Sequence, residues 1–315
     1  MIKWEYSGFK KLIKVLKTNK GGCSVYGVNF FRNPIGLIGC SVLKELLEPS
    51  RNASLTDLNL SRCSIDTNGL AHLMKGLAKN ANLVKLNLRK NPLGGQSAGV
   101  LIAKAVSINQ CLQFLDIGQT DFDSASVCSF VSTVKSINKQ NRKLNTLILS
   151  ENGICDIGAK AVSDLLLSNN MKLLHLDLQG NAITSTGASM IAKGVAKNKF
   201  LLYLGLQWNK INNEGAKDLG ASLTRNTALK AMFLIGNEIT KEGARYIIEG
   251  SLTFDDTPVC IDIDTMPARP RGYRIEAEAE LEKTKVLFYI FIFDNHIYYK
   301  KSHIFISIVL YYLYL

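Results

Sequence analysis

The sequence predicts an α/β solenoid, a horseshoe in which one parallel sheet lines the concave side and helices cover the convex side. A short alternating motif recurs along the chain at a nearly constant interval, and each copy is followed by a run of helical periodicity. Hydrophobic residues make up 47% of the 315 residues, enough to form a buried core. Stacked strand–turn–helix units satisfy all of these observations.

The strand half of each unit has the form L-x-x-L-x-L-x-x-N. It is clearest in LLYLGLQWNKI, which starts at Leu201, and most degenerate in VYGVNFFRNPI, which starts at Val25. The leucines of one unit could not be buried by that unit alone, so they predict a core shared between stacked units. The eight copies follow one another at intervals of 28–32 residues and start at Val25, Leu55, Leu83, Leu112, Leu144, Leu173, Leu201 and Leu229.

The helical half of each unit begins near a glycine or serine and continues as an amphipathic run. In GAKDLGASLTRN, for example, Ala216, Leu219 and Leu223 recur at helical spacing. Because asparagine tolerates the left-handed conformation that often ends a helix, we expect it to end these helices in that way. Six of the runs close on an asparagine, at Asn80, Asn109, Asn138, Asn169, Asn198 and Asn226.

A second asparagine position closes the strand motif. Its side chains are expected to satisfy backbone groups that the tight bend leaves unpaired in neighbouring turns. Cys63 and Thr120 replace asparagine in two units and can do part of that work. The asparagines of this ladder are Asn33, Asn91, Asn152, Asn181, Asn209 and Asn237.

This pattern resembles the leucine-rich repeat, and its unit length and helix resemble the ribonuclease-inhibitor-like subclass. The wording L-x-L-Q-W-N and N-x-I-x-x-x-G-A, seen at residues 204–216, is similar to that of the repeat arrays of NOD-like receptors. The resemblance covers Val25 to Ile263 and implies a leucine-rich-repeat domain over residues 25–265. It is far more specific for the fold than for the function.

The two ends of the chain are less regular. Residues 1–24 are expected to form an N-terminal helix, either a cap or part of a truncated repeat, because FKKLIKVLKTN resembles the helical half of a unit. PVCIDID, from Pro258, predicts a last strand. Residues 266–285 are predicted to be a linker with a short polar helix.

Residues 286–315 form an aromatic tail of low complexity that is foreign to the repeats. Its apolar runs are interrupted by Asp294, Asn295 and the Lys300–Lys301 pair, so none reaches the roughly 20 residues of a membrane-spanning helix. Three interpretations stay open: translated non-coding sequence that is not native, a membrane or partner anchor, and a packed cap. A membrane is expected as a partner only if this tail is native.

Charge and cysteine content restrict the environment. The formal net charge is +12, but a basic balance indicates nucleic acid or anionic lipid only where the charges form a patch. The seven cysteines are odd in number and show no zinc spacing, and the N-terminus has no signal-peptide pattern. We therefore expect reduced thiols in a cytoplasmic or nuclear protein.

No sequence motif argues for catalysis. The chain has no G-x-x-x-x-G-K-[ST], so the nucleotide-binding module of whole NOD-like receptors is not in it. It also has no H-E-x-x-H. We expect neither an enzyme nor a bound cofactor or metal.

The concave face should display the third, fifth and seventh positions of each unit, with the eighth at its edge. Read in columns, these positions give two zones. Scattered apolar residues are ordinary on surfaces, and Trp208 has an alternative role in covering the next unit's leucine. The basic zone contains Arg32, Arg62, Lys85, Arg89 and Lys90. The aromatic zone contains His175, Tyr203, Trp208, Phe233 and Ile235.

Exposed aromatic residues beside basic ones are typical of interface centres, so we predict a non-enzymatic module or scaffold that binds a protein on its concave face. The alternative is a regulator of a small GTPase, because the repeats also resemble those of Ran GTPase-activating proteins, although the acidic C-terminal tract of that family is missing. Nucleic acid is not expected, because aromatic residues do not interleave with the basic ones.

Overall fold

The computed structural model describes residues 6–18, 25–48, 54–137, 143–168, 170–251, 259–263, 289–293 and 296–300. Within these residues, parallel strands β1 to β9 form one sheet in chain order. The strands are β1 (Gly27–Asn29), β2 (Asp57–Asn59), β3 (Lys85–Asn87), β4 (Phe114–Asp116), β5 (Thr146–Ile148), β6 (His175–Asp177), β7 (Tyr203–Gly205), β8 (Ala231–Phe233) and β9 (Cys260–Asp262). The helices are α1 (Tyr6–Thr18), α2 (Gly36–Leu47), α3 (Thr67–Lys79), α4 (Gln96–Ile108), α5 (Ser124–Ile137), α6 (Asp156–Ser168), α7 (Ser185–Lys197), α8 (Asn213–Leu223) and α9 (Lys241–Ser251).

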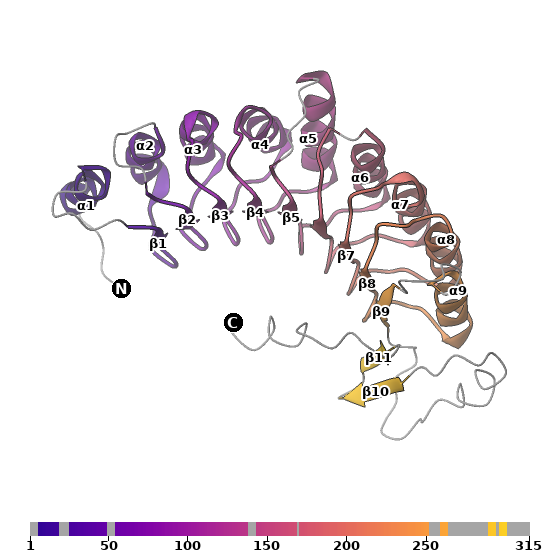
Figure 1. The fold of residues 1–315 in the computed structure, drawn as a ribbon. Helices are drawn as coiled ribbons and strands as arrows, with labels where there is room; N and C mark the ends of the chain where they lie inside the picture. The colour runs from indigo at the N-terminus through magenta and orange to yellow at the C-terminus, as the bar shows by residue number, and fades with distance from the viewer. Residues whose placement is uncertain are drawn as a thin grey trace.

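The chain is an α/β solenoid, as the repeat pattern predicts. The strands run along the inner side of an arc and the helices along its outer side (Figure 1). Each strand pairs with the next without stagger, so that equivalent positions of successive repeats lie side by side. This register turns the positions of the sequence motif into columns on the concave face.

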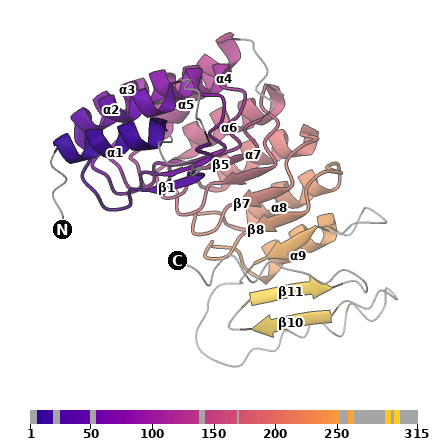
Figure 2. The same cartoon turned by 60° about the vertical axis from the view of Figure 1, so that its left-hand side comes forward.

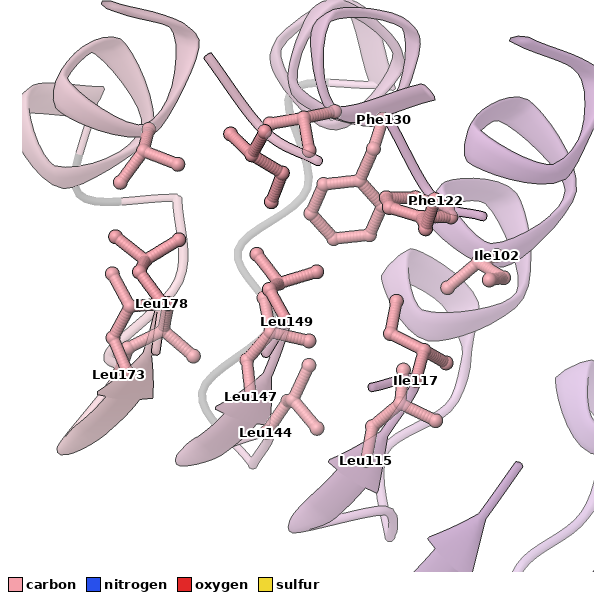
Figure 3. Packing of buried hydrophobic residues seen from close by; sticks show 14 of the residues in the cluster. Ile102, Leu115, Ile117, Phe122, Phe130, Leu144, Leu147, Leu149, Leu173 and Leu178 are labelled. Atoms are coloured by element: carbon pink, nitrogen blue, oxygen red, sulfur yellow. The ribbon is translucent and has the colours of Figure 1, made fainter. Parts of the chain in front are cut away.

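The leucine positions form the core between the sheet and the helices. Leu147, Leu176 and Leu204, at the same position of three successive repeats, are each at most 1% exposed. Figure 3 shows leucines of several strands lying under the helices, with the rings of Phe122 and Phe130 above them. Those two rings meet edge to face, with centroids 6.4 Å apart. Stacking therefore buries side chains that a single unit would leave in water.

The predicted asparagine ladder at the end of the strand motif is present. The side-chain Oδ1 of Asn181 accepts hydrogen bonds from the backbone N–H groups of Asn152 and Ile154, both at 3.0 Å. Its Nδ2 donates to the carbonyl oxygens of Leu149 and Leu178, at 3.2 and 2.8 Å. One buried amide thus satisfies groups in its own turn and in the preceding repeat, which would otherwise be unpaired.

Backbone hydrogen bonds help to link adjacent repeats at the two ladder positions that lack asparagine. The N–H of Ile35 donates to the backbone carbonyl of Cys63 at 2.9 Å, and that of Leu93 donates to the carbonyl of Thr120 at 3.1 Å. The Cys63 thiol and the Thr120 hydroxyl each donate to a carbonyl of a nearby strand end. The two substitutions therefore keep adjacent repeats joined.

The helix-ending asparagines are not left-handed, so that prediction is wrong. Asn80, Asn109 and Asn198 all have extended backbones, with φ of −70°, −66° and −76°. The physical reason lies in their side chains, which bond in two directions. In Asn198, Oδ1 accepts from the N–H of Leu201 at 2.8 Å, and Nδ2 donates to Leu166 O, in the preceding repeat, at 2.9 Å. Asn138 and Asn169 lie outside the described residues.

Left-handed backbone occurs instead at the eighth position of the motif, a row that we call the rim. For example, Trp208 has a φ of +55°, and its N–H donates to the carbonyl of Ile235 in the next repeat at 2.8 Å. Because such bonds recur from repeat to repeat, the rim is a rigid row. Its members are Arg32, Arg62, Lys90, Gln119, Glu151, Gly180, Trp208 and Gly236.

The two ends of the solenoid differ. Helix α1 packs Phe9 and Ile13 into the core, with the Phe9 ring 5.4 Å from that of Phe30. In the tail, strands β10 (Tyr289–Phe293) and β11 (His296–Lys300) form an antiparallel hairpin (Figure 2), and β11 lies near β9 (Figure 1). The polar helix predicted within residues 266–285 lies outside the described residues. Across the described part of the chain, none of the helices combines the length and apolarity needed to cross a membrane.

Candidate partner-binding surface

The fifth-position column of the concave face is largely structural. In five repeats an asparagine or aspartate there turns its Oδ1 back onto the backbone N–H two residues later, at 2.8–3.0 Å. Sequence reasoning missed this role, although the recurrence of Asn and Asp in one column signalled it. The residues are Asn29, Asn59, Asn87, Asp116 and Asp177.

The structure divides the predicted basic zone into two parts. Lys85 Nζ lies 3.4 Å from Asp57 Oδ1, and Arg89 pairs with Glu151, so both of these cations have carboxylate partners. The other three members, Arg32, Arg62 and Lys90, are exposed on the rim. No ion pair holds these three within the described residues.

Arg89 belongs to a polar network at the middle of the sheet. Its guanidinium donates to Ser150 Oγ at 2.8 Å and to Glu151, whose carboxylate also accepts from the Gln119 amide. The carboxyl groups of Asp116 and Asp177 lie near this network. Burial raises the pKa of both, while backbone hydrogen bonds and Arg89 lower it in part. The positive charge of Arg89 is therefore neutralised by a carboxylate of the chain itself.

Phe31 lies beside the N-terminal end of the rim and was missing from the predicted site. Its ring is 43% exposed, and the guanidinium carbons of Arg32 and Arg62 lie 5.0 and 6.0 Å from its centroid. These are cation–π distances. The available signal was an aromatic residue at the seventh position directly before a rim arginine.

The aromatic zone is brought together on strands β6 to β8. His175 and Tyr203 are paired in the sheet, and their rings lie 5.9 Å apart at 55°. Phe233, at the end of β8, and Ile235, two residues later, are half-buried. Tyr203 is 36% exposed and Trp208 is 60% exposed. All five predicted residues thus come from three consecutive repeats.

Trp208 is held at the rim against glycine. Its ring lies over Gly236, at the same position of the next repeat, where a Cβ would come within 2.9 Å of the ring carbon Cζ3 and closer to others. Gly180 occupies this position in the preceding repeat. The ring is therefore positioned by backbone contact on one side and remains largely open to solvent.

The aromatic zone is neutral at its histidine. Burial lowers the pKa of His175, and the neighbouring Asp177 opposes this shift only in part. The imidazole is consequently uncharged at neutral pH. The paired His175 and Tyr203 rings form an uncharged surface.

The described residues contain no group of three or more His, Cys, Asp or Glu side chains that could hold a metal ion. Among their thiols, Cys40 and Cys63 are buried, and burial raises the pKa of Cys40 to about 12 and that of Cys63 to about 11. These two thiols are therefore protonated and are poor nucleophiles at neutral pH.

Comparison with known proteins identifies the repeats. The family described as Leucine Rich repeat matches residues 51–74, 140–163, 169–192 and 197–220. NACHT, LRR and PYD domains-containing protein 13 of Homo sapiens is 29% identical over 194 residues, covering 61% of this chain and 17% of that protein. Protein 3 of the same name from Bos taurus is 31% identical over 132 residues, covering 42% of this chain and 12% of that protein.

The chain thus spans less than a fifth of the length of these relatives. Among solved structures, internalin C2 of Listeria monocytogenes has 18% identity and a TM-score of 0.44, covering 76% of this chain and 89% of that one. The predicted resemblance to the repeat arrays of NOD-like receptors is confirmed. The chain is built of leucine-rich repeats and is homologous to the leucine-rich-repeat regions of NACHT, LRR and PYD domains-containing proteins.

Proposed function

We propose that the chain is a non-enzymatic protein-interaction module and that its aromatic zone forms the central contact with a partner. The observation that carries this proposal is the ring of Trp208, which is 60% exposed and is held over Gly236. A left-handed backbone costs a residue other than glycine about 1–3 kcal/mol, and glycine fills the same position in both flanking repeats. Five other rim residues that are not glycine share this backbone, so the strain belongs to the motif position, and it is the exposed, fixed ring that favours a role outside the chain.

The surroundings of Trp208 support the same conclusion. Tyrosine and tryptophan are enriched among the residues that dominate binding energies, because they bury large areas and lose little conformational freedom. Tyr203 is held by the His175 ring, and Trp208 is held by Gly236, so both are ordered before a partner arrives. Preorganised side chains lower the entropic cost of association.

The proposed partner is a protein, and neither a membrane nor nucleic acid is part of this proposal. We place the module in the cytoplasm or nucleus, where thiols stay reduced, because Cys40, Cys63, Cys111, Cys128, Cys155 and Cys260 are all free.

The test uses the full chain as bait, with partners identified by affinity purification and mass spectrometry. Tyr203→Ala, Phe233→Ala and Trp208→Gly are compared with the wild type. Glycine is the informative replacement at Trp208 because the fold already uses it at this position. We expect the free energy of unfolding of each variant to stay within about 0.5 kcal/mol of the wild type, as for most surface substitutions. Partner recovery should fall sharply.

Gln119→Gly is the matched control, because Gln119 occupies the same left-handed rim position in another repeat. It should keep the partner. If all three aromatic-zone variants fold normally and retain the partner, the aromatic zone is not the binding site. A lowered melting temperature for Trp208→Gly would instead show that the tryptophan serves repeat packing.

A further inference from the structure

Three rim cations stand in a row at the N-terminal end of the solenoid. Arg32, Arg62 and Lys90 occupy the same motif position in the first three repeats, and all three have a left-handed backbone. Each N–H donates to a carbonyl of the next repeat at 2.9–3.1 Å, so the side chains project from a fixed row. The acceptors are the carbonyls of Ser61, Arg89 and Gly118.

The three rim cations differ from the neighbouring cations in having no carboxylate partner within the described residues. Lys85 and Arg89, on the sheet beside them, are paired with Asp57 and Glu151. Within the described residues no such pair involves the rim cations. Adjacent strands of a sheet lie about 4.8 Å apart, so like charges in successive repeats repel one another. An anionic ligand would relieve that repulsion.

Phe31 orients two of the three cations. The guanidiniums of Arg32 and Arg62 both lie within cation–π distance of its ring. A guanidinium beside an aromatic ring can still donate through its N–H groups, and these match the two oxygens of a carboxylate. The patch therefore combines fixed donors with an exposed apolar ring.

We propose that Phe31, Arg32, Arg62 and Lys90, here named the cationic rim, bind an acidic peptide segment. This inference rests on the proposed protein-binding function and adds a second contact with a stated chemistry, at residues separate from the aromatic zone. Carboxylates fit better than nucleic acid because single-stranded nucleic acid needs a series of aromatic platforms for its bases. The cationic rim has one aromatic ring, and two guanidiniums already lie against it.

The experiment measures the binding of fluorescein-labelled hexaglutamate to the full chain by fluorescence anisotropy. Arg32→Gly, Arg62→Gly and Lys90→Gly remove the cations without straining the left-handed backbone. Each should weaken binding about tenfold, the loss expected for one charge-assisted hydrogen bond. Binding should also weaken when NaCl is raised from about 50 to about 300 mM. Melting curves verify that each variant is folded.

Lys85→Ala is the matched control, since it removes one positive charge near the rim from a lysine that is already paired. It should change the affinity less than about twofold, as an exposed ion pair contributes little. Equal losses for Lys85→Ala and Arg62→Gly would reduce the effect to net charge and overturn the proposal.

Two other outcomes would also overturn it. One is no binding of hexaglutamate, and the other is tighter binding of an oligothymidylate of equal charge, which would make the rim a nucleic-acid contact. The capture experiment tests the proposed function independently of the peptide-binding experiment. Partner capture that depends on Tyr203 can persist when hexaglutamate does not bind. Conversely, the Tyr203→Ala variant can lose the partner and still bind hexaglutamate, because its cationic rim is unchanged.

Discussion

The guanidinium of Arg89 lies over Gly118. Arg89 follows strand β3, and it crosses the next repeat to hydrogen-bond Ser150 Oγ, after β5, at 2.8 Å. A Cβ at position 118 would collide with Nη1 of Arg89 and lie 2.8 Å from Ser150 Oγ. The missing side chain of Gly118 is thus the reason that the charge of Arg89 can reach Glu151.

Gly118→Ala should displace Arg89 and cost about 1 kcal/mol, within the range of a hydrogen bond to a charged group that stays partly solvated. Urea unfolding measures the loss. The same substitution in an Arg89→Ala background should cost much less, because the guanidinium is gone and only the Ser150 hydroxyl, the end of a small side chain, remains close. Additive costs in this double-mutant cycle would show that the two residues are not coupled.

Each core leucine of the strand motif should contribute strongly to the stability of the fold. Leu176 and Leu204 are both fully buried, so replacing either with Ala should lower the free energy of unfolding by about 2–5 kcal/mol. Tyr203→Ala, on the opposite face of strand β7, is the control and should cost far less. Near-native urea midpoints for both leucine variants would contradict the alternation of the strands.

Asn198 should stabilise through its side chain, since its backbone is extended. Asn198→Leu would leave the N–H groups of Phe200 and Leu201 and the carbonyl of Leu166 without these partners. Each buried polar group left unpaired costs about 1–3 kcal/mol, so we expect a loss of several kcal/mol in chemical unfolding. Asn198→Gly should be no less harmful. If Asn198→Gly were as stable as the wild type, the result would instead support a left-handed end for this helix.

His175 predicts a pH dependence of stability. Its folded pKa lies below the ordinary value of about 6.5, so the unfolded chain binds its proton first as the pH falls. Stability should therefore be complete above that pH and decline below it, down to the folded pKa. NMR titration should give a pKa below 6.5, and Asp177→Asn should lower it further, because the carboxylate favours the charged imidazole. A pKa above 6.5 would contradict the burial of the ring.

Repetition explains how much of the fold could be predicted. Stacked units place equal motif positions side by side, so the leucine columns, the strand-closing asparagines and the strand order followed from spacing alone. Asn198 departed from prediction because asparagine ends helices in more than one way. Its choice depends on a carbonyl of Leu166, 32 residues earlier in sequence.

The candidate surface was less predictable because it depends on where long side chains turn. Columns placed Arg89 beside Arg62, but its partner Glu151 is two repeats away and becomes accessible only because position 118 is glycine. The aromatic zone was simpler, since His175 and Tyr203 are direct neighbours in register. Motif position thus determines the face on which a side chain lies and leaves its partner undetermined.

Photo-crosslinking tests the central claim, that a protein partner sits on the aromatic zone of the concave face. A photoreactive p-benzoylphenylalanine replaces Tyr203 in one sample and Ile157, which is 68% exposed at the start of helix α6, in another. After irradiation with partners captured by the full chain, position 203 should yield a crosslinked partner, and position 157 should yield none. A crosslink from position 157 without one from position 203 would contradict the account.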